Sequence, residues 1–256
     1  MNRAKQAGLG AILLVAGLGI WWLAALRLGK PYLLPPPADV VASLLDKIKD
    51  GTLLPAIGTS AARVGLGYLL SLALGIPLGL ALARTPWLDR TVGAAVAGLS
   101  SLPSICWFPL ALLWFGINEK AVLFVVVLGS VFAVTLAVRG GVLALPPLIL
   151  RAAQTLGARG WNLWRHVLIP ASLPATLSGM RQGWAMAWRS LMSAELLSQS
   201  LKTGVGHLLN TGRDLNDMPL VLAMIVVILC LGLLVDKALF LPVERYIVRR
   251  WGVAGA

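Results

Sequence analysis

Arg63, Arg181, Arg189 and Glu195 are ionisable residues that stand within long apolar stretches of this 256-residue sequence. A charge in such a place is costly and needs a partner of opposite sign or a water-filled path. A planar guanidinium presents several N–H donors that match an oxyanion, so Arg181 and Arg189 favour the binding of a small anion. No nucleophile–base set or metal-ligand cluster accompanies them in these stretches. The sequence therefore predicts neither an intramembrane enzyme nor a metal site.

Arg181 and Arg189 belong to one apolar stretch, residues 170–201, whose composition is typical of a helix. At 100° per residue, its cations and hydrogen-bond donors share one arc: Arg181, Gln182, Arg189 and Ser193. Large aromatic and thioether side chains lie beside that arc: Trp184, Trp188 and Met192. Small residues suited to close helix packing form a further face: Gly183, Ala187, Ser190 and Ala194. We predict that the pathway of a polar anion is lined by Arg181, Trp184, Trp188, Arg189 and Ser193.

The depth of each charge in its span indicates its role. Arg189 lies near the middle of residues 170–201, where its side chain cannot easily reach the membrane surface, so contact with the transported anion is favoured. Arg181 lies nearer the inner interface, where a structural cation is the alternative. Arg63 and Glu195 lie about 12 Å and about 10 Å inside the outer ends of their spans, at 1.5 Å per residue. Neither has an opposite charge one turn away, so we predict an ion pair between them across two neighbouring helices.

The composition indicates that lipid surrounds the helices that carry these charges. Hydrophobic residues make up 58% of the chain, charged residues only 12%, and the mean hydropathy is +0.84. Soluble domains carry about twice that share of charge. The net charge of +12 is spread between the apolar runs rather than gathered in a patch, which favours membrane topology over nucleic-acid binding.

The apolar runs predict an all-α polytopic membrane bundle of about six transmembrane helices in a single transmembrane domain, residues 1–256. The predicted spans are 9–26, 57–83, 92–115, 121–138, 170–201 and 220–241. Residues 57–241 form the core, and prolines break the third span. The segment Leu34–Pro37 cannot be helical, and Ala38 to Asp50 is predicted to be a short surface helix.

Basic residues predict the orientation in the membrane. With both termini in the cytoplasm, the inner segments hold twelve Lys and Arg residues and the outer segments hold seven. The positive-inside rule favours this arrangement. We therefore expect a multi-pass membrane protein with both ends cytoplasmic.

A basic stretch between the fourth and fifth spans carries the most specific motif. It contains Arg151-Ala152-Ala153, three residues, Gly157, nine residues, then Val167-Leu168-Ile169-Pro170. Gly157 permits a turn that a Cβ opposes, and Pro170 suits the first turn of a helix. We predict a helical hairpin over residues 147–169 that exposes Arg159, Trp161 and Trp164 for docking. An ordinary hairpin between spans is the alternative.

This motif resembles the coupling helix of permeases in binding-protein-dependent ABC importers, written EAA, three residues, G, nine residues, I, any residue, LP. Both alanines, the glycine, the proline and all spacings match, whereas Arg151 stands in place of the glutamate. Three further segments are similar to the sulfonate, taurine and nitrate permeases: Leu34–Pro37, Gly75-Ile76-Pro77-Leu78-Gly79, and Leu102-Pro103 with Pro109-Leu110 and Trp114-Phe115-Gly116. The fifth-span residues Gly179-Met180-Arg181, Ala187-Trp188 and Ala194-Glu195-Leu196 match as well.

The resemblance implies that residues 1–256 are a single permease domain in the bacterial inner membrane. It also implies a non-catalytic transport subunit that moves a small anion by alternating access. Two copies of the permease, a homodimer, would bind two ATPase subunits through Arg151, Ala152, Ala153, Gly157, Arg159, Trp161 and Pro170. A periplasmic or lipid-anchored binding protein would deliver substrate to the loops at residues 38–50 and 202–217. The chain itself would hold no cofactor, since it lacks a P-loop; ATP and Mg would bind the partner ATPase.

Two questions stay open at this point. A secondary transporter or channel that works without an ATPase is the alternative function, although it does not explain the hairpin. The anion is a sulfonate by first choice and taurine or nitrate next. Hydroxymethylpyrimidine-type thiamine precursors are a further alternative.

Overall fold

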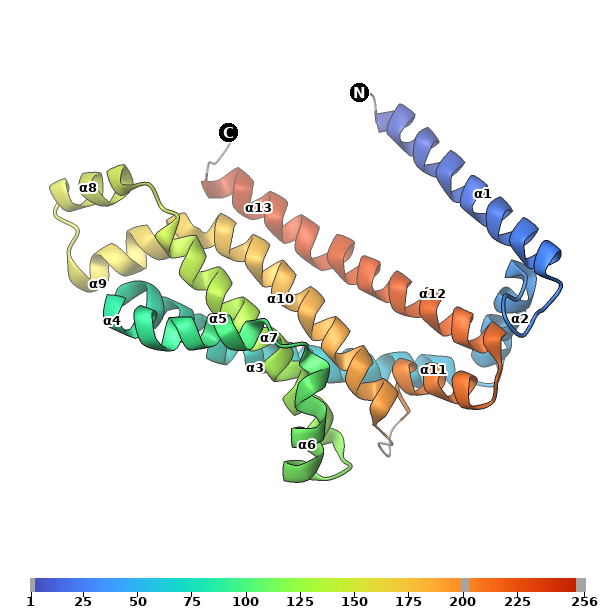
Figure 1. The fold of residues 1–256 in the computed structure, drawn as a ribbon. Helices are drawn as coiled ribbons and strands as arrows, with labels where there is room; N and C mark the ends of the chain where they lie inside the picture. The colour runs from blue at the N-terminus through green and yellow to red at the C-terminus, as the bar shows by residue number, and fades with distance from the viewer. Residues whose placement is uncertain (1–2, 199–202, 252–256) are drawn as a thin grey trace. The chain divides into compact units, whose positions relative to one another are not determined.

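The structure is a computed structural model and describes residues 3–198 and 203–251 (Figure 1). All secondary structure in these ranges is helical. The elements up to the middle of the chain are α1 (Arg3–Leu28), α2 (Pro37–Lys49), α3 (Leu53–Arg84), α4 (Pro86–Leu88), η1 (Asp89–Gly93), α5 (Ala94–Ser100), η2 (Ser104–Trp107), α6 (Phe108–Phe115) and α7 (Glu119–Leu143). The later elements are α8 (Pro147–Thr155), α9 (Gly160–Leu163), η3 (Trp164–Leu168), α10 (Ile169–Leu197), α11 (Val205–Asp214), α12 (Met218–Val235), η4 (Asp236–Phe240) and α13 (Leu241–Trp251).

The chain divides into two compact units, residues 1–59 with 202–229 and residues 60–201 with 230–256. In the first unit α1 lies beside α2, and the indole Nε1 of Trp21 donates a hydrogen bond to the carbonyl of Pro35, 3.1 Å away. The helix α2 begins at Pro37, so the prediction that Leu34–Pro37 is wholly non-helical is wrong at its last residue. A proline is tolerated there because the first helical N–H needs no partner.

Small residues bring the helices of the second unit together around α7. A Cβ on Gly75 or Gly79 of α3 would approach α7 within 3 Å, at Val134 and Thr135. From the other side, a Cβ on Gly183 of α10 would lie 2.8 Å from the side chain of Val134. The predicted small-residue face of α10 is buried along its length, at Gly183, Ala187, Ser190 and Ala194. Close backbone approach therefore sets the positions of α3, α7 and α10.

The helices confirm a membrane-spanning bundle but fewer strongly apolar spans than the six expected. Three helical stretches in the described residues are long and apolar enough to cross a membrane: α3, α7 and Met218–Ile247. Two helical segments that meet at a bend, Pro86–Ser100 and Ser104–Phe115, form a fourth membrane span if they are counted as one. The helix α10 has 29 residues, but its polar arc lowers its hydropathy. The described apolar part of α1, Val15–Leu28, is short.

The third predicted span is broken, as its prolines indicate. Its two halves meet at an angle of 100°, and Pro103 stands in the break. By contrast α3 continues through Pro77 as one helix. Leu201 and Lys202, the predicted end of the fifth span and start of the following loop, lie outside the described residues.

Candidate functional site

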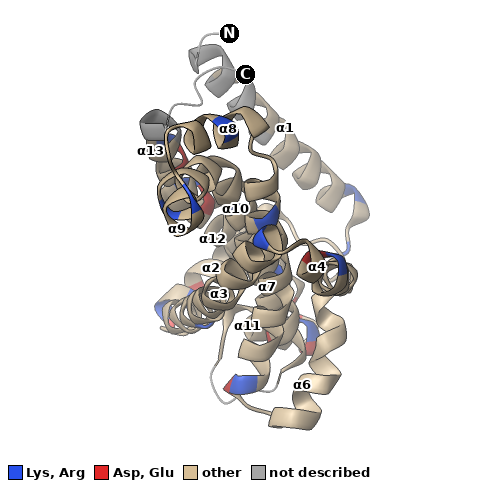
Figure 2. Cartoon of the chain, turned by 90° about the vertical axis from the view of Figure 1, so that its left-hand side faces the viewer, with Lys and Arg blue, Asp and Glu red and all other residues tan. Residues whose placement is uncertain are grey.

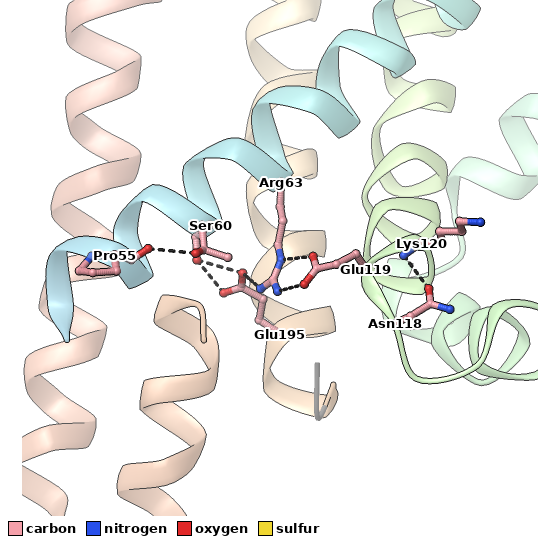
Figure 3. A network of polar contacts seen from close by, with 8 residues as sticks. Pro55, Ser60, Arg63, Asn118, Glu119, Lys120 and Glu195 are labelled. Atoms are coloured by element: carbon pink, nitrogen blue, oxygen red, sulfur yellow. Dashed lines mark hydrogen bonds and ion pairs between the residues drawn. The ribbon is translucent and has the colours of Figure 1, made fainter. Parts of the chain in front are cut away.

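A buried ion network joins α3, α7 and α10 (Figure 3). The Nη1 of Arg63 donates to Oε1 of Glu195 at 2.7 Å. Its Nε and Nη2 donate to the two carboxylate oxygens of Glu119, at 2.7 and 2.6 Å. The Oγ of Ser60 donates to Glu195, with the two oxygens at 2.9 and 2.8 Å. One guanidinium thus bridges two carboxylates from two other helices.

Because two members of this network are buried, removing one charged partner is expected to lower the stability of the protein. The side chains of Arg63 and Glu195 are 5% and 1% exposed, and that of Glu119 is 37% exposed. The structure places Arg63 and Glu195 together, and it adds Glu119 and Ser60, which the sequence reasoning did not include. A guanidinium carries five N–H donors, and one carboxylate cannot accept from all of them. This surplus of donors is the signal in the sequence that pointed to a second carboxylate near Arg63.

Arg181 is engaged by carboxylates from the end of the sixth predicted span. Its Nε and Nη2 donate to Asp236, and its Nη1 donates to Oε2 of Glu244 at 3.2 Å. The charge of Arg181 is therefore balanced inside the protein. Its place on the anion pathway stays a prediction, and the pairing supports the structural alternative.

Arg189 has a different environment, because its guanidinium is exposed. Its Nε donates to the carbonyl of Ala185 at 3.2 Å within the same helix. Among the described residues no carboxylate forms an ion pair with it. The Nη donors of Arg189 thus remain available for an anion.

Two cavities meet at Arg189. One, of about 410 Å³, brings together four of the five predicted pathway residues with Asp236: Arg181, Trp184, Trp188 and Arg189. The fifth, Ser193, lines a second cavity of about 380 Å³ that Arg189 also lines. Trp184 stacks edge-on against Tyr68, with ring centroids 5.3 Å apart. The predicted residues therefore line two cavities, and Arg189 belongs to the lining of both.

The basic segment after α7 folds as the predicted hairpin of short helices. Gly157 follows α8 with φ at +86°, the left-handed region that a Cβ opposes. The N–H groups of Gly157 and Ala158 donate to the carbonyls of Gln154 and Ala153, at 3.0 and 2.9 Å. These two bonds close the turn that reverses the chain into α9.

A small apolar cluster holds the hairpin together, and its outer surface is basic. Ala153, Leu163 and Leu168 are buried, and Trp164 packs against them. The expectation that Trp164 is exposed was therefore wrong, whereas Trp161 is 64% exposed. The remaining predicted docking residues Arg151, Ala152 and Arg159 are exposed, and Pro170 lies in the first turn of α10. Figure 2 shows basic segments on α8 and α9.

Helices that span a membrane, an exposed arginine beside cavities and a basic hairpin define a transport protein. Residues 75–241 match the family model described as binding-protein-dependent transport system inner membrane component. The chain is 30% identical to the taurine transport system permease protein TauC of Escherichia coli, over 92% of this chain and 87% of that protein. It is 29% identical to the putative aliphatic sulfonates transport permease protein SsuC of Escherichia coli, over 94% of this chain and 91% of that one.

A solved structure agrees on the fold. A chain of the MetNI methionine ABC transporter, in an inward-facing conformation, superposes with a TM-score of 0.66 at 20% identity, over 76% of this chain and 95% of that chain. The present chain belongs to the family of binding-protein-dependent transport system inner membrane components. It is the permease subunit of an ABC importer, a non-catalytic inner-membrane protein whose ATPase is a separate subunit.

Proposed function

We propose that this permease imports a small organic or inorganic anion, with a sulfonate as first choice and taurine or nitrate next. The single observation that carries the proposal is the exposed guanidinium of Arg189, at the meeting point of two cavities. The names of the taurine and aliphatic sulfonate relatives support the same class of substrate. Membership of the ABC family argues against the alternative of a secondary transporter or channel.

The proposed assembly is a homodimer that works by alternating access as one domain of residues 1–256, with both termini in the cytoplasm. Two ATPase subunits dock on the hairpin at residues 147–169, and the binding protein contacts the loops at residues 38–50 and 202–217. The rigid turn at Gly157 and the exposed Trp161 support docking at the hairpin. Closure of the ATPase pair then moves α10, which follows the hairpin directly in sequence and carries Arg189.

Arg189→Ala is expected to lower ATP-driven uptake of ethanesulfonate by roughly tenfold or more, because a charge-assisted hydrogen bond contributes roughly 1.5–3 kcal/mol. Arg189→Lys is expected to restore part of the rate, since it keeps the charge and loses the planar donor fork. Uptake into proteoliposomes that contain the permease, its ATPase and its binding protein measures the effect.

The matched control is Arg27→Ala, which removes an exposed arginine at the end of α1. That variant is expected to transport at the wild-type rate. Equal uptake by the wild type and Arg189→Ala, with both complexes fully assembled, would remove Arg189 from the pathway.

A further inference from the structure

The break in the third span contains serine side chains that are not among the proposed pathway residues. The sequence Ser100-Ser101-Leu102-Pro103-Ser104 connects the two halves of this span. Non-helical backbone at membrane depth is tolerated only where protein buries it or where it lines a water-filled cavity. All five of these residues line the cavity of about 380 Å³.

Three elements converge on this cavity. Gly129 of α7 lies between the break and α10: a Cβ there would collide with Ser190 Oγ and lie 3.1 Å from Ser104 Cβ. Arg189 belongs to the same turn of α10 as Ser190. Five serines therefore line this cavity together with Arg189: Ser100, Ser101, Ser104, Ser190 and Ser193.

These hydroxyls are able to turn toward a ligand. The Oγ of Ser101 donates to the carbonyl of Gly98 at 2.7 Å, and the Oγ of Ser100 donates to the carbonyl of Ala97 at 2.8 Å. Each bond lies within one turn of its own exposed helix end, and a hydroxyl rotates about its C–O bond. An oxyanion in the cavity would offer a charged acceptor, which forms a stronger bond than a neutral carbonyl.

The charge of the lining selects the kind of ligand. None of the residues that line this cavity is acidic, whereas Asp236 lines the cavity on the other side of Arg189. Apolar side chains complete the wall, among them Ile105, Phe132 and Met186. A ligand with an ammonium group would lose hydration here without gaining a carboxylate partner. A singly charged oxyanion with an uncharged apolar tail gains partners at both ends.

We propose that the break of the third span and Arg189 together form an oxyanion subsite that holds a small alkanesulfonate-like anion and disfavours a zwitterion. The serines of the break donate to the oxyanion, and Ile105, Phe132 and Met186 contact its tail. This subsite rests on the proposed function, since it refines which anion the permease carries. It assigns to Ser100, Ser101 and Ser104 a part in binding substrate.

The test is equilibrium binding of radiolabelled ethanesulfonate to the permease–ATPase complex without the binding protein, so that only the membrane site contributes. The double variant Ser101→Ala/Ser104→Ala is expected to bind roughly tenfold or more weakly, from the loss of two hydrogen bonds to a charged group. The wild type is expected to bind ethanesulfonate at least tenfold more tightly than taurine, which has the same sulfonate with an added ammonium group.

The matched control is Thr91→Val, in the first half of the same span. Its hydroxyl also bonds to the carbonyl of an earlier residue, at 3.1 Å from Trp87, but it lines neither cavity. This variant is expected to bind as the wild type does. Two results would overturn the subsite alone, provided that the wild type still shows ATP-driven uptake. One is unchanged binding of ethanesulfonate by the serine variant, and the other is equal binding of taurine and ethanesulfonate by the wild type. Absence of ATP-driven uptake of ethanesulfonate, taurine and nitrate would overturn the proposed function and the subsite with it.

Discussion

Arg63→Met is expected to destabilise the permease by about 3–5 kcal/mol, because it leaves the carboxylate of Glu195 buried without its cation. Glu195 is 1% exposed, and its hydrogen bond from the hydroxyl of Ser60 is neutral and does not replace the positive charge of Arg63. Glu195→Gln is expected to cost less, since Arg63 still bridges to Glu119 through two hydrogen bonds. Unfolding of the solubilised permease in denaturant measures each loss.

A double-mutant cycle separates the ion pair from general packing. Combining Arg63→Met with Glu195→Gln removes both buried charges, so the double variant is expected to lose less stability than the sum of the single losses. Lys47→Met serves as the control, because it removes an exposed pair with Asp50 at 2.9 Å that contributes at most about 1 kcal/mol. Strictly additive losses at Arg63 and Glu195 would show that the two residues do not stabilise each other.

Gly157→Val is expected to reduce ATP-driven uptake by at least tenfold while insertion into the membrane is retained. The φ of +86° at this residue strains any side chain by about 1–3 kcal/mol, and a β-branched one most. The strain falls on the turn that joins α8 to α9, so the docking surface of the hairpin loses its shape. ATP hydrolysis and uptake, measured on the same proteoliposomes, report the loss of coupling.

Two variants show whether backbone conformation is the cause. Gly157→Asn is expected to keep much of the activity, because asparagine tolerates the left-handed region better than valine. Gly140→Val makes the same chemical change near the end of α7, where the helix is regular and nothing lies within 4 Å of the added Cβ. This control is expected to couple normally. Full transport by Gly157→Val with its ATPase bound would refute the role assigned to the hairpin.

Much of the fold follows from local features of the sequence. Pro103 marked the broken span, because a proline removes a helical hydrogen bond and constrains the residue before it. Gly157 marked the turn of the hairpin, and the spacing of Gly183, Ala187 and Ser190 marked the face that packs on α7. Each of these signals acts within a few residues of its own position.

The parts that sequence reasoning missed depend on contacts between distant segments. Asp236 pairs with Arg181 across 55 residues of sequence, and Glu119 pairs with Arg63 across 56. Glu119 was not among the residues predicted for the ion pair, because nothing local shows that α7 begins beside the buried part of α3. The serines around Pro103 were likewise not predicted as binding residues, since their cavity exists only when α7 and α10 pack against them.

The central claim is that this chain carries a small anion only when a separate ATPase drives it. Uptake of radiolabelled ethanesulfonate into proteoliposomes, with and without the ATPase subunits and with the binding protein outside, tests it most directly. The account predicts accumulation that requires ATP and the ATPase and falls with Arg189→Ala. Uptake by the permease alone at the same rate, or no uptake of ethanesulfonate, taurine or nitrate by the complete complex, would contradict it.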